Sequence, residues 1–100
     1  MNHFSLPLTE SQLASLSVRL RVLGDPVRLR LVHRLATGPC GVSELSRHVG
    51  STQPNVSKHL KVLLGEGVVG RTQVRNTAVY ALIDEQVTSM WKLVKAAEVE

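Results

Sequence analysis

The chain has 100 residues, 43% of them hydrophobic and 20% charged, with one Phe, one Tyr and one Trp, which predicts a single globular domain with an aliphatic core. A domain of this size is small for an enzyme with a deep cleft. The sequence contains neither a glycine-rich phosphate loop nor a suggestive Ser/His/Asp order, so no catalytic activity is predicted. The net charge is +4, but residues 19–75 contain ten Lys or Arg and three acidic residues, a local charge of +7. This basic block favours a polyanionic partner, with nucleic acid ahead of other classes.

The cysteine count and the N-terminus bear on the compartment. The single cysteine, Cys40, excludes a disulfide within the chain. The first residues, MNHFSLPLTE, lack the basic and apolar regions of a signal peptide, and no apolar run approaches the roughly 20 residues that span a bilayer. We therefore expect a cytoplasmic protein with no membrane partner.

Residues 1–8 are predicted to form a flexible N-terminal tail and residues 98–100 a C-terminal tail, which leaves 9–97 as the domain. Thr9 and Gln12 have the spacing of a capping box, which predicts the start of a first helix that Gly24 ends. Such a helix has a narrow apolar stripe made of Leu13, Leu16, Leu20 and Leu23. A stripe of this kind on a terminal helix either pairs with a partner helix or packs on the core of its own chain.

Asp25 followed by Pro26 predicts the start of a second helix, because an acidic N-cap and a proline at the first helical position both favour it. Its apolar residues cover a wide arc, which predicts a central position in the fold: Leu29, Leu31, Val32, Leu35 and Ala36. Gly38 and Pro39 end this helix. A short third helix is expected over 43–49, and Gly50 closes it.

Residues 43–64 are predicted to form a helix-turn-helix, since only a tight turn separates the short helix from the next one. Thr52 is the expected N-cap of the second of these helices, and Pro54 is tolerated in its first turn. Its buried stripe is expected to contain Val56, Leu60, Leu63 and Leu64.

Residues 68–82 alternate in the manner of β-strands and are predicted to form a hairpin, or wing, with its tip at 74–76 and Asn76 in a left-handed conformation. Asp84 is the expected cap of a last helix that carries an apolar side made of Val87, Met90, Trp91 and Val94. The predicted fold class is therefore a mainly α winged helix-turn-helix with the order helix, helix, helix, helix, strand, strand, helix.

The polar face of the predicted helix over 52–64 has the composition of a DNA-reading surface. In a helix-turn-helix the second helix enters the major groove with its N-terminal residues at the base edges. Gln53 and Asn55 suit base edges, Ser57 suits a base or a phosphate, and lysines suit phosphates. His59 lies at the margin of the buried stripe and either contacts phosphate or makes a structural hydrogen bond. The candidate DNA-binding residues are Thr52, Gln53, Pro54, Asn55, Ser57, Lys58, His59 and Lys61, with Arg71 and Arg75 from the wing. The alternative is a merely solvated amphipathic helix.

Three segments together resemble a known family: LGDPVRLRLVHRL, VSELSRHVGSTQPNVSKHLKVL and VYAL. They are similar to the ArsR/SmtB family of bacterial winged-helix repressors from about Leu23 to Leu82. The resemblance implies a homodimer on a pseudo-palindromic operator, with the first and last helices at the interface. The matching residues would be Leu13, Leu16 and Leu20 together with Val87, Met90, Trp91 and Val94. It also implies that Arg28 is structural rather than a DNA contact.

The metal sites of that family are largely lost in this sequence. Where family members have paired thiolates, this chain has Gly41 and Ser43, while Cys40 falls on the adjacent apolar position and is interpreted as a small buried hydrophobe. A thiol-based sensor would need a second thiol from another subunit. At the family's site on the last helix the slots hold Asp84, Gln86, Ala97 and Glu100, without imidazole, which nickel and zinc favour. No metal or other cofactor is therefore predicted, and the weak candidate ligands are His3, Asp84 and Glu100.

The predicted function is a homodimeric, sequence-specific DNA-binding regulator, a repressor by default, on an inverted-repeat operator. Its input would be a small molecule, a metal or a partner protein. One alternative is a nickel- or zinc-responsive regulator with non-standard ligands. An alternative of another class is a protein-interaction module that uses the winged-helix scaffold without DNA.

Overall fold

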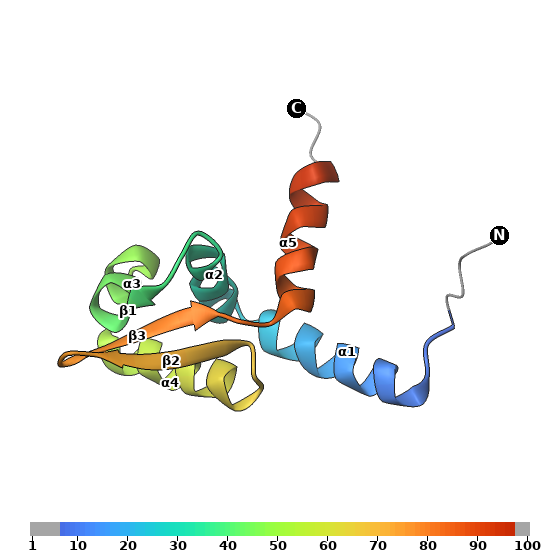
Figure 1. Ribbon diagram of the computed structural model, residues 1–100, viewed down its shortest axis with the longest axis horizontal. Helices are drawn as coiled ribbons and strands as arrows, with labels where there is room; N and C mark the ends of the chain where they lie inside the picture. Colours follow the sequence, from blue (N-terminus) through green and yellow to red (C-terminus); the bar gives the residue numbers. More distant parts are fainter. Residues whose placement is uncertain (1–6, 98–100) are drawn as a thin grey trace.

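The computed structural model describes residues 7–97, so the predicted tails lie almost entirely outside the described residues. The elements in chain order are α1 (Glu10–Leu23), α2 (Pro26–Leu35), β1 (Cys40–Gly41), α3 (Val42–Val49), α4 (Gln53–Gly65), β2 (Val69–Val74), β3 (Thr77–Leu82) and α5 (Glu85–Ala97). In Figure 1, α2, α3, α4 and the sheet form a body from which α1 and α5 diverge, and the β2–β3 tip lies at the end away from both termini.

The helix starts follow from local chemistry. The Thr9 hydroxyl accepts from the Gln12 backbone N–H at 3.0 Å, and the Gln12 side chain accepts from the Thr9 N–H at 2.9 Å, so the predicted capping box is confirmed. The Asp25 carboxylate accepts from the backbone N–H groups of Val27 and Arg28 at 3.0 and 3.1 Å, with Pro26 at the first position of α2. These two caps fix where α1 and α2 begin.

The sheet has the order β1-β3-β2, all antiparallel. The strand β1 is missing from the predicted order, because two residues are too few to show a period. It pairs Cys40 with Tyr80 and Gly41 with Val79. In the wing, Val74 lies opposite Thr77, and the left-handed residue is Arg75 with φ 58°, not Asn76. The prediction for Asn76 is wrong because this register makes Arg75 the first residue of the two-residue loop.

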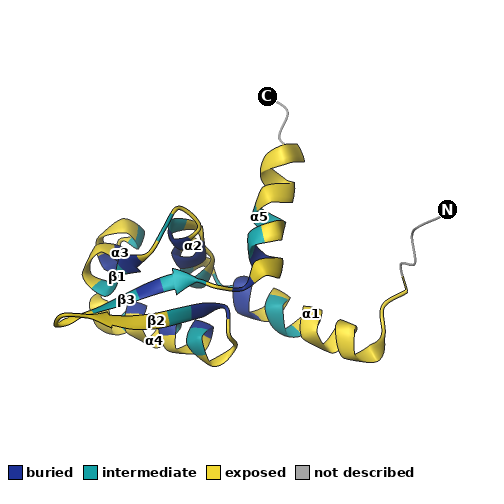
Figure 2. Ribbon diagram, viewed as in Figure 1, coloured by how far each residue is buried: buried dark blue, intermediate teal, exposed yellow. Residues whose placement is uncertain are grey.

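The core is aliphatic apart from Cys40 and Tyr80 and lies between the helices and the sheet (Figure 2). Its buried members are Val22, Leu23, Leu31, Val32, Leu35, Cys40, Leu45, Val56, Leu60, Leu63, Val68, Val69, Tyr80 and Val87. Leu29 and Ala36 are exposed, so the buried arc of α2 is narrower than predicted. Leu64 is half-buried and packs at the edge of the core. None of the described helices is both long enough and apolar enough to cross a membrane.

Candidate nucleic-acid interface

The turn between α3 and α4 is fixed by hydrogen bonds of its own residues. Gly50 adopts a left-handed conformation, with φ 69° and ψ 38°. In this conformation its N–H donates to the carbonyls of Ser46 and Arg47 in the last turn of α3. Only glycine adopts such an angle without a steric cost. Ser51 N–H donates to the Ser46 carbonyl at 3.1 Å, and the Thr52 hydroxyl caps α4 by accepting from Asn55 N–H at 3.3 Å. The connection thus sets the direction of α4 relative to α3.

The buried face of α4 holds the helix to the body. Val56, Leu60 and Leu63 have no exposed surface. Complete burial of a Val or Leu side chain contributes about 1.5–3 kcal/mol relative to exposure. The opposite face is exposed, as predicted, and α4 contains two lysines and no acidic residue. Its exposed candidate residues are Gln53, Pro54, Ser57, Lys58 and Lys61.

The two predicted base-reading amides are engaged with the turn. Gln53 Nε2 donates to Ser43 Oγ at 2.9 Å, and Asn55 Nδ2 donates to Ser51 Oγ at 2.8 Å. Gln53 is nevertheless exposed, whereas Asn55 is half-buried. Because Asn55 is held back against the turn, Gln53 is the better placed of the two to reach a base edge.

A hollow of about 600 Å³ lies beside the N-terminus of α4. It is lined by Ser43, Ser46, Arg47, Gly50, Ser51, Thr52 and Gln53. Helix N-termini favour anions because their first N–H groups lack helical partners. Arg47 and Ser43 are absent from the residues that the sequence predicts to bind DNA. The one signal for Arg47 was its place in the last turn of the first helix of the helix-turn-helix.

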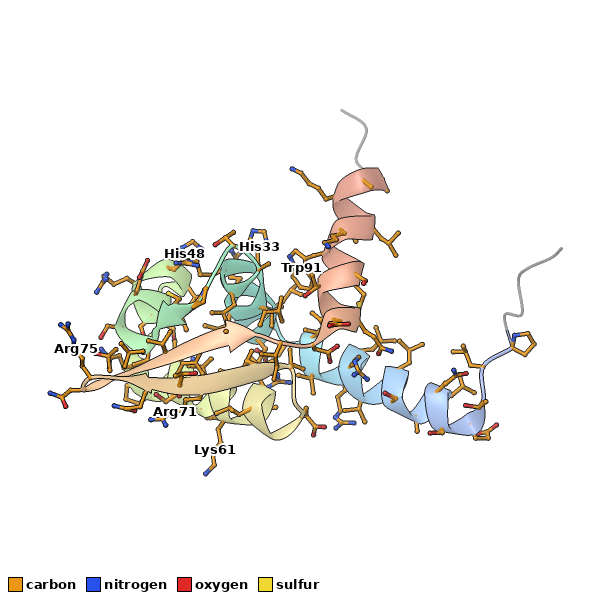
Figure 3. The ribbon with its side chains drawn as sticks, viewed as in Figure 1. His33, His48, Lys61, Arg71, Arg75 and Trp91 are labelled. Atoms are coloured by element: carbon orange, nitrogen blue, oxygen red, sulfur yellow. The ribbon has the colours of Figure 1, made fainter. Side chains whose placement is uncertain are left out.

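The wing carries its two arginines on exposed positions, Arg71 on β2 and Arg75 at the tip. Figure 3 shows Lys61 and Arg71 projecting from the same side of the molecule and Arg75 at the far end of the hairpin. His48, on α3, lies on the opposite side in this view. Of the predicted cationic contacts, Lys61 of α4 and Arg71 of β2 therefore lie on one side in this view.

His59 makes the structural interaction that was one of its two predicted roles. Its side chain is only 13% exposed, and its Nδ1 lies 3.2 Å from an Arg28 guanidinium nitrogen and 3.6 Å from Asp25 Oδ2. Arg28 Nε also donates to the Val22 carbonyl at 2.7 Å, so Arg28 has the structural role that the resemblance implied. The backbone N–H of Arg28 lowers the pKa of Asp25, the nearby charges of His59 and Arg28 lower it further, and desolvation opposes them.

Asp84 caps α5 as predicted, and the same carboxylate holds α1. Its Oδ1 accepts from the backbone N–H groups of Gln86 and Val87 at 3.0 and 3.3 Å, and its Oδ2 accepts from Arg19 Nε at 2.9 Å. Both oxygens are thus engaged in holding Arg19 and the start of α5, which gives Asp84 a structural role. The other candidate ligands, His3 and Glu100, lie outside the described residues. Within 7–97 no group of three His, Cys, Asp or Glu side chains is arranged to hold a metal ion.

Cys40 is buried in β1, in agreement with its interpretation as a small hydrophobe. Burial raises the pKa of its thiol, with the Arg34 charge opposing that effect. A thiol that is inaccessible and protonated is a poor nucleophile and a poor metal ligand.

The predicted dimer surface is exposed on α1 and divided on α5. All residues of 10–17 are exposed, including Leu13 and Leu16 of the stripe, and Leu20 of the stripe is exposed as well. On α5, Val94 is exposed and Met90 and Trp91 are half-buried, but Val87 is 0% exposed. Val87 therefore belongs to the core of the protomer, and its assignment to the dimer surface is wrong. It lies in the first turn of α5, where the helix still covers the core.

A groove of about 1120 Å³ separates α2 from α5, and its lining is mostly apolar. Leu29, the residue that the sequence assigned to the core, lines this groove together with Trp91 and His33. Trp91 Nε1 donates to His33 Nδ1 at 3.1 Å, and Figure 3 shows the two side chains between the helices.

Comparison with known proteins identifies the family. A sequence model described as "Bacterial regulatory protein, arsR family" matches residues 25–70. The HTH-type transcriptional regulator CmtR of Mycobacterium tuberculosis is 42% identical over 77 residues, 77% of this chain and 63% of CmtR, so the chain spans less than two thirds of that relative's length. The HTH-type transcriptional regulator NmtR of the same organism is 33% identical over 89 residues, 89% of this chain and 74% of NmtR.

The fold agrees with these matches. The crystal structure of the transcriptional repressor BigR from Xylella fastidiosa has a TM-score of 0.81 and 28% identity, and the match covers 91% of this chain and 94% of that chain. The winged helix-turn-helix architecture predicted from the sequence is confirmed. The chain belongs to the arsR family of bacterial regulatory proteins.

Proposed function

We propose that the chain is a sequence-specific DNA-binding transcriptional regulator, a repressor by default, that acts in the cytoplasm. The observation that carries this proposal is the exposed face of α4, which presents Gln53, Ser57, Lys58 and Lys61 while Val56, Leu60 and Leu63 fix the helix to the core. The names of the relatives support the same activity, since CmtR and NmtR are HTH-type transcriptional regulators and BigR is a repressor.

The exposed groups divide into base-reading and phosphate-binding residues. Gln53 has a paired donor and acceptor suited to a base edge in the major groove. Lys58 and Lys61 suit phosphates, which fix the register of the protein without reading sequence. The hollow at the N-terminus of α4, with Arg47 on its lining, suits a further phosphate. Arg71 and Arg75 of the wing would extend the contact to neighbouring backbone or groove.

A homodimer is proposed because α1 lacks packing over its first half. Residues 10–17 are all exposed, and a helix of that length is marginal in water without tertiary contacts. Leu13, Leu16 and Leu20 would be covered by a second copy, together with Trp91 and Val94 of α5. Two copies related by a two-fold axis place two α4 helices on an inverted-repeat operator.

The input remains a small molecule, a metal or a partner protein. Of these, a nickel or zinc site with non-standard ligands is disfavoured by the engagement of both Asp84 oxygens. The exposed face of α4 and strand β2 carry Lys and Arg. This positively charged surface also disfavours a winged-helix protein-interaction module without DNA, because a surface of one charge sign does not attract a neutral partner.

The test is selection of binding sites from a random duplex pool, followed by titration of the recovered duplex at several salt concentrations. A regulator with six or more phosphate contacts should lose roughly 10³-fold or more in affinity between 50 and 200 mM salt. Lys61→Ala should weaken binding to every sequence and reduce the salt slope by about 1, whereas Gln53→Ala should relax preference at one base pair by about 1–3 kcal/mol. Lys92→Ala, on exposed α5, is the matched control. Absence of binding at low salt would contradict the proposal.

A further inference from the structure

His59 is the side chain of α4 that connects the proposed recognition helix to the junction of α1 and α2. Its Nδ1 faces the Arg28 guanidinium at 3.2 Å, and Arg28 Nε donates to the carbonyl of Val22, in the last turn of α1, at 2.7 Å. The contact spans 31 positions of sequence. A continuous path of two hydrogen bonds therefore joins the end of α1, a proposed dimer helix, to the middle of α4.

The chemistry of the pair fixes the tautomer of His59. A guanidinium only donates hydrogen bonds, so Nδ1 of His59 must accept and Nε2 must carry the proton of the neutral ring. A second proton on the ring would occupy Nδ1, remove the acceptor and place two positive charges together. The alternative partner for a protonated Nδ1 is already in place, because Asp25 Oδ2 lies 3.6 Å from it. Asp25 is available as an anion, since its pKa is lowered.

We propose that His59 is a positioning residue that locks the recognition helix to the α1–α2 junction through Arg28, and that protonation of His59 exchanges Arg28 for Asp25 and weakens DNA binding. This inference rests on the proposed function and adds a regulatory input to it. Histidine is the side chain whose ordinary charge change falls between about pH 5 and 8, so this is the range that a test of the proposal has to cover.

The charged groups that face His59 are few. Asp25 and Arg28, from the α2 side, interact with its ring, and α1 contributes the uncharged Val22 carbonyl through Arg28. Across the described residues, no charged side chain of α3 or β2 interacts with His59. On α4 itself, Lys58 and Lys61 lie on the exposed face. Arg28 and Asp25 are therefore the two charged groups between which the ring exchanges in this proposal.

The proposal predicts a sign opposite to that of a direct phosphate contact. A His59 that met phosphate would bind DNA more tightly as the pH falls, because the imidazolium attracts the backbone. A His59 that positions α4 through Arg28 binds DNA less tightly as the pH falls, because the lock opens. Measuring DNA affinity over one pH series therefore distinguishes the two roles that the sequence leaves open for His59, a phosphate contact and a structural hydrogen bond.

The experiment measures the affinity of the full chain for a duplex recovered from the random pool, between about pH 5.5 and pH 8 at constant ionic strength. The wild type should lose about tenfold in affinity toward the acid end, which is the effect of losing one hydrogen bond to a charged group. His59→Asn places an amide oxygen near the position of Nδ1 but cannot take up a proton in this range, so its affinity should lose the pH dependence of the wild type. His48→Asn, at an exposed position of α3, should retain the dependence of the wild type.

A second measurement follows the ring without DNA. Nitrogen-15 spectra of the histidines should show His59 as the Nε2–H tautomer at pH 8. An Nδ1–H tautomer would overturn the proposal, as would equal pH profiles for the wild type and His59→Asn, or an affinity that rises toward acid only in the wild type. A wild-type protein that binds no duplex at any pH would instead contradict the proposed function, and the inference would fall with it.

Discussion

Arg19 of α1 and Asp84 at the start of α5 form an ion pair with an Nε to Oδ2 distance of 2.9 Å, and only 5% of the Asp84 side chain is exposed. The same carboxylate caps α5. The residue before it, Ile83, donates its N–H to the Val68 carbonyl at 3.0 Å, just ahead of β2. One side chain therefore joins both helices of the proposed dimer surface at the base of the wing.

Replacing Asp84 should lower the free energy of unfolding through two effects that can be separated: loss of the cap of α5 and loss of the charge that pairs with Arg19. Asp84→Ala removes the cap of α5 and the carboxylate that pairs with Arg19, so we expect a loss of about 2–3 kcal/mol in the free energy of unfolding. Asp84→Asn keeps a capping oxygen and loses only the charge, and should cost less. Gln86→Ala, an exposed neighbour, should change stability by less than about 0.5 kcal/mol in urea denaturation. Equal losses for Asn and Ala would show that the cap contributes nothing.

The Asp25 cap of α2 should make a contribution to the free energy of unfolding that is lost at acid pH. The pKa of Asp25 is lowered in the folded chain from the ordinary 3.8, chiefly by the Arg28 backbone N–H. Its contribution is therefore complete above the unfolded pKa and is lost as the pH falls through the lower, folded value. Asparagine is also a good N-cap, so Asp25→Asn retains the geometry without the titration.

The expected measurement is the difference in unfolding free energy between the wild type and Asp25→Asn as a function of pH. Below about pH 4 this difference should decline, because the Asp25 carboxylate of the wild type takes up its proton there. A difference that grows as the pH falls below about 4 would mean that the folded pKa of Asp25 is raised, contrary to its hydrogen bonds.

Sequence predicts those parts of the fold that depend on interactions between residues close together in the chain. The caps at Thr9, Asp25 and Asp84 were readable because each donor lies two or three residues from its acceptor. The partner of His59 was not readable, because Arg28 is distant in sequence and the choice between phosphate and guanidinium depends on tertiary packing.

Spacing also predicts which face of a helix is apolar without saying how far the core extends beneath it. Val87 and Val94 lie on one side of α5, but Val87 covers the core and Val94 lies beyond its edge, 73% exposed. The strand β1 was not predicted for a related reason: its two residues form a strand only because they pair with Tyr80 and Val79.

The two glycines at the C-terminal ends of α3 and α4 should respond oppositely to alanine. Gly50 has φ 69° and open space around the position of a Cβ, so Gly50→Ala should cost about 1–2 kcal/mol through backbone strain alone. Gly65 ends α4 with an ordinary φ and open space, and Gly65→Ala should stabilise by about 0.4–1 kcal/mol because it restricts the unfolded chain. Urea denaturation measures both. A neutral Gly50→Ala would mean that the turn relaxes to a different conformation.

The exposed stripe of α1 should control assembly. Leu16 is 39% exposed in the protomer and lies in the half of α1 that the rest of the described chain leaves uncovered. Leu16→Glu would place a charge in an apolar interface, where an unpaired buried carboxylate is costly, so the dimer should dissociate at micromolar protein concentration. Val74→Glu, at an apolar position on the wing that is 50% exposed, is the matched control and should leave the dimer intact. Sedimentation velocity distinguishes the two masses, while circular dichroism checks that the body remains folded. A Leu16→Glu variant that still sediments as a dimer would remove α1 from the interface and leave α5 as the remaining contact surface.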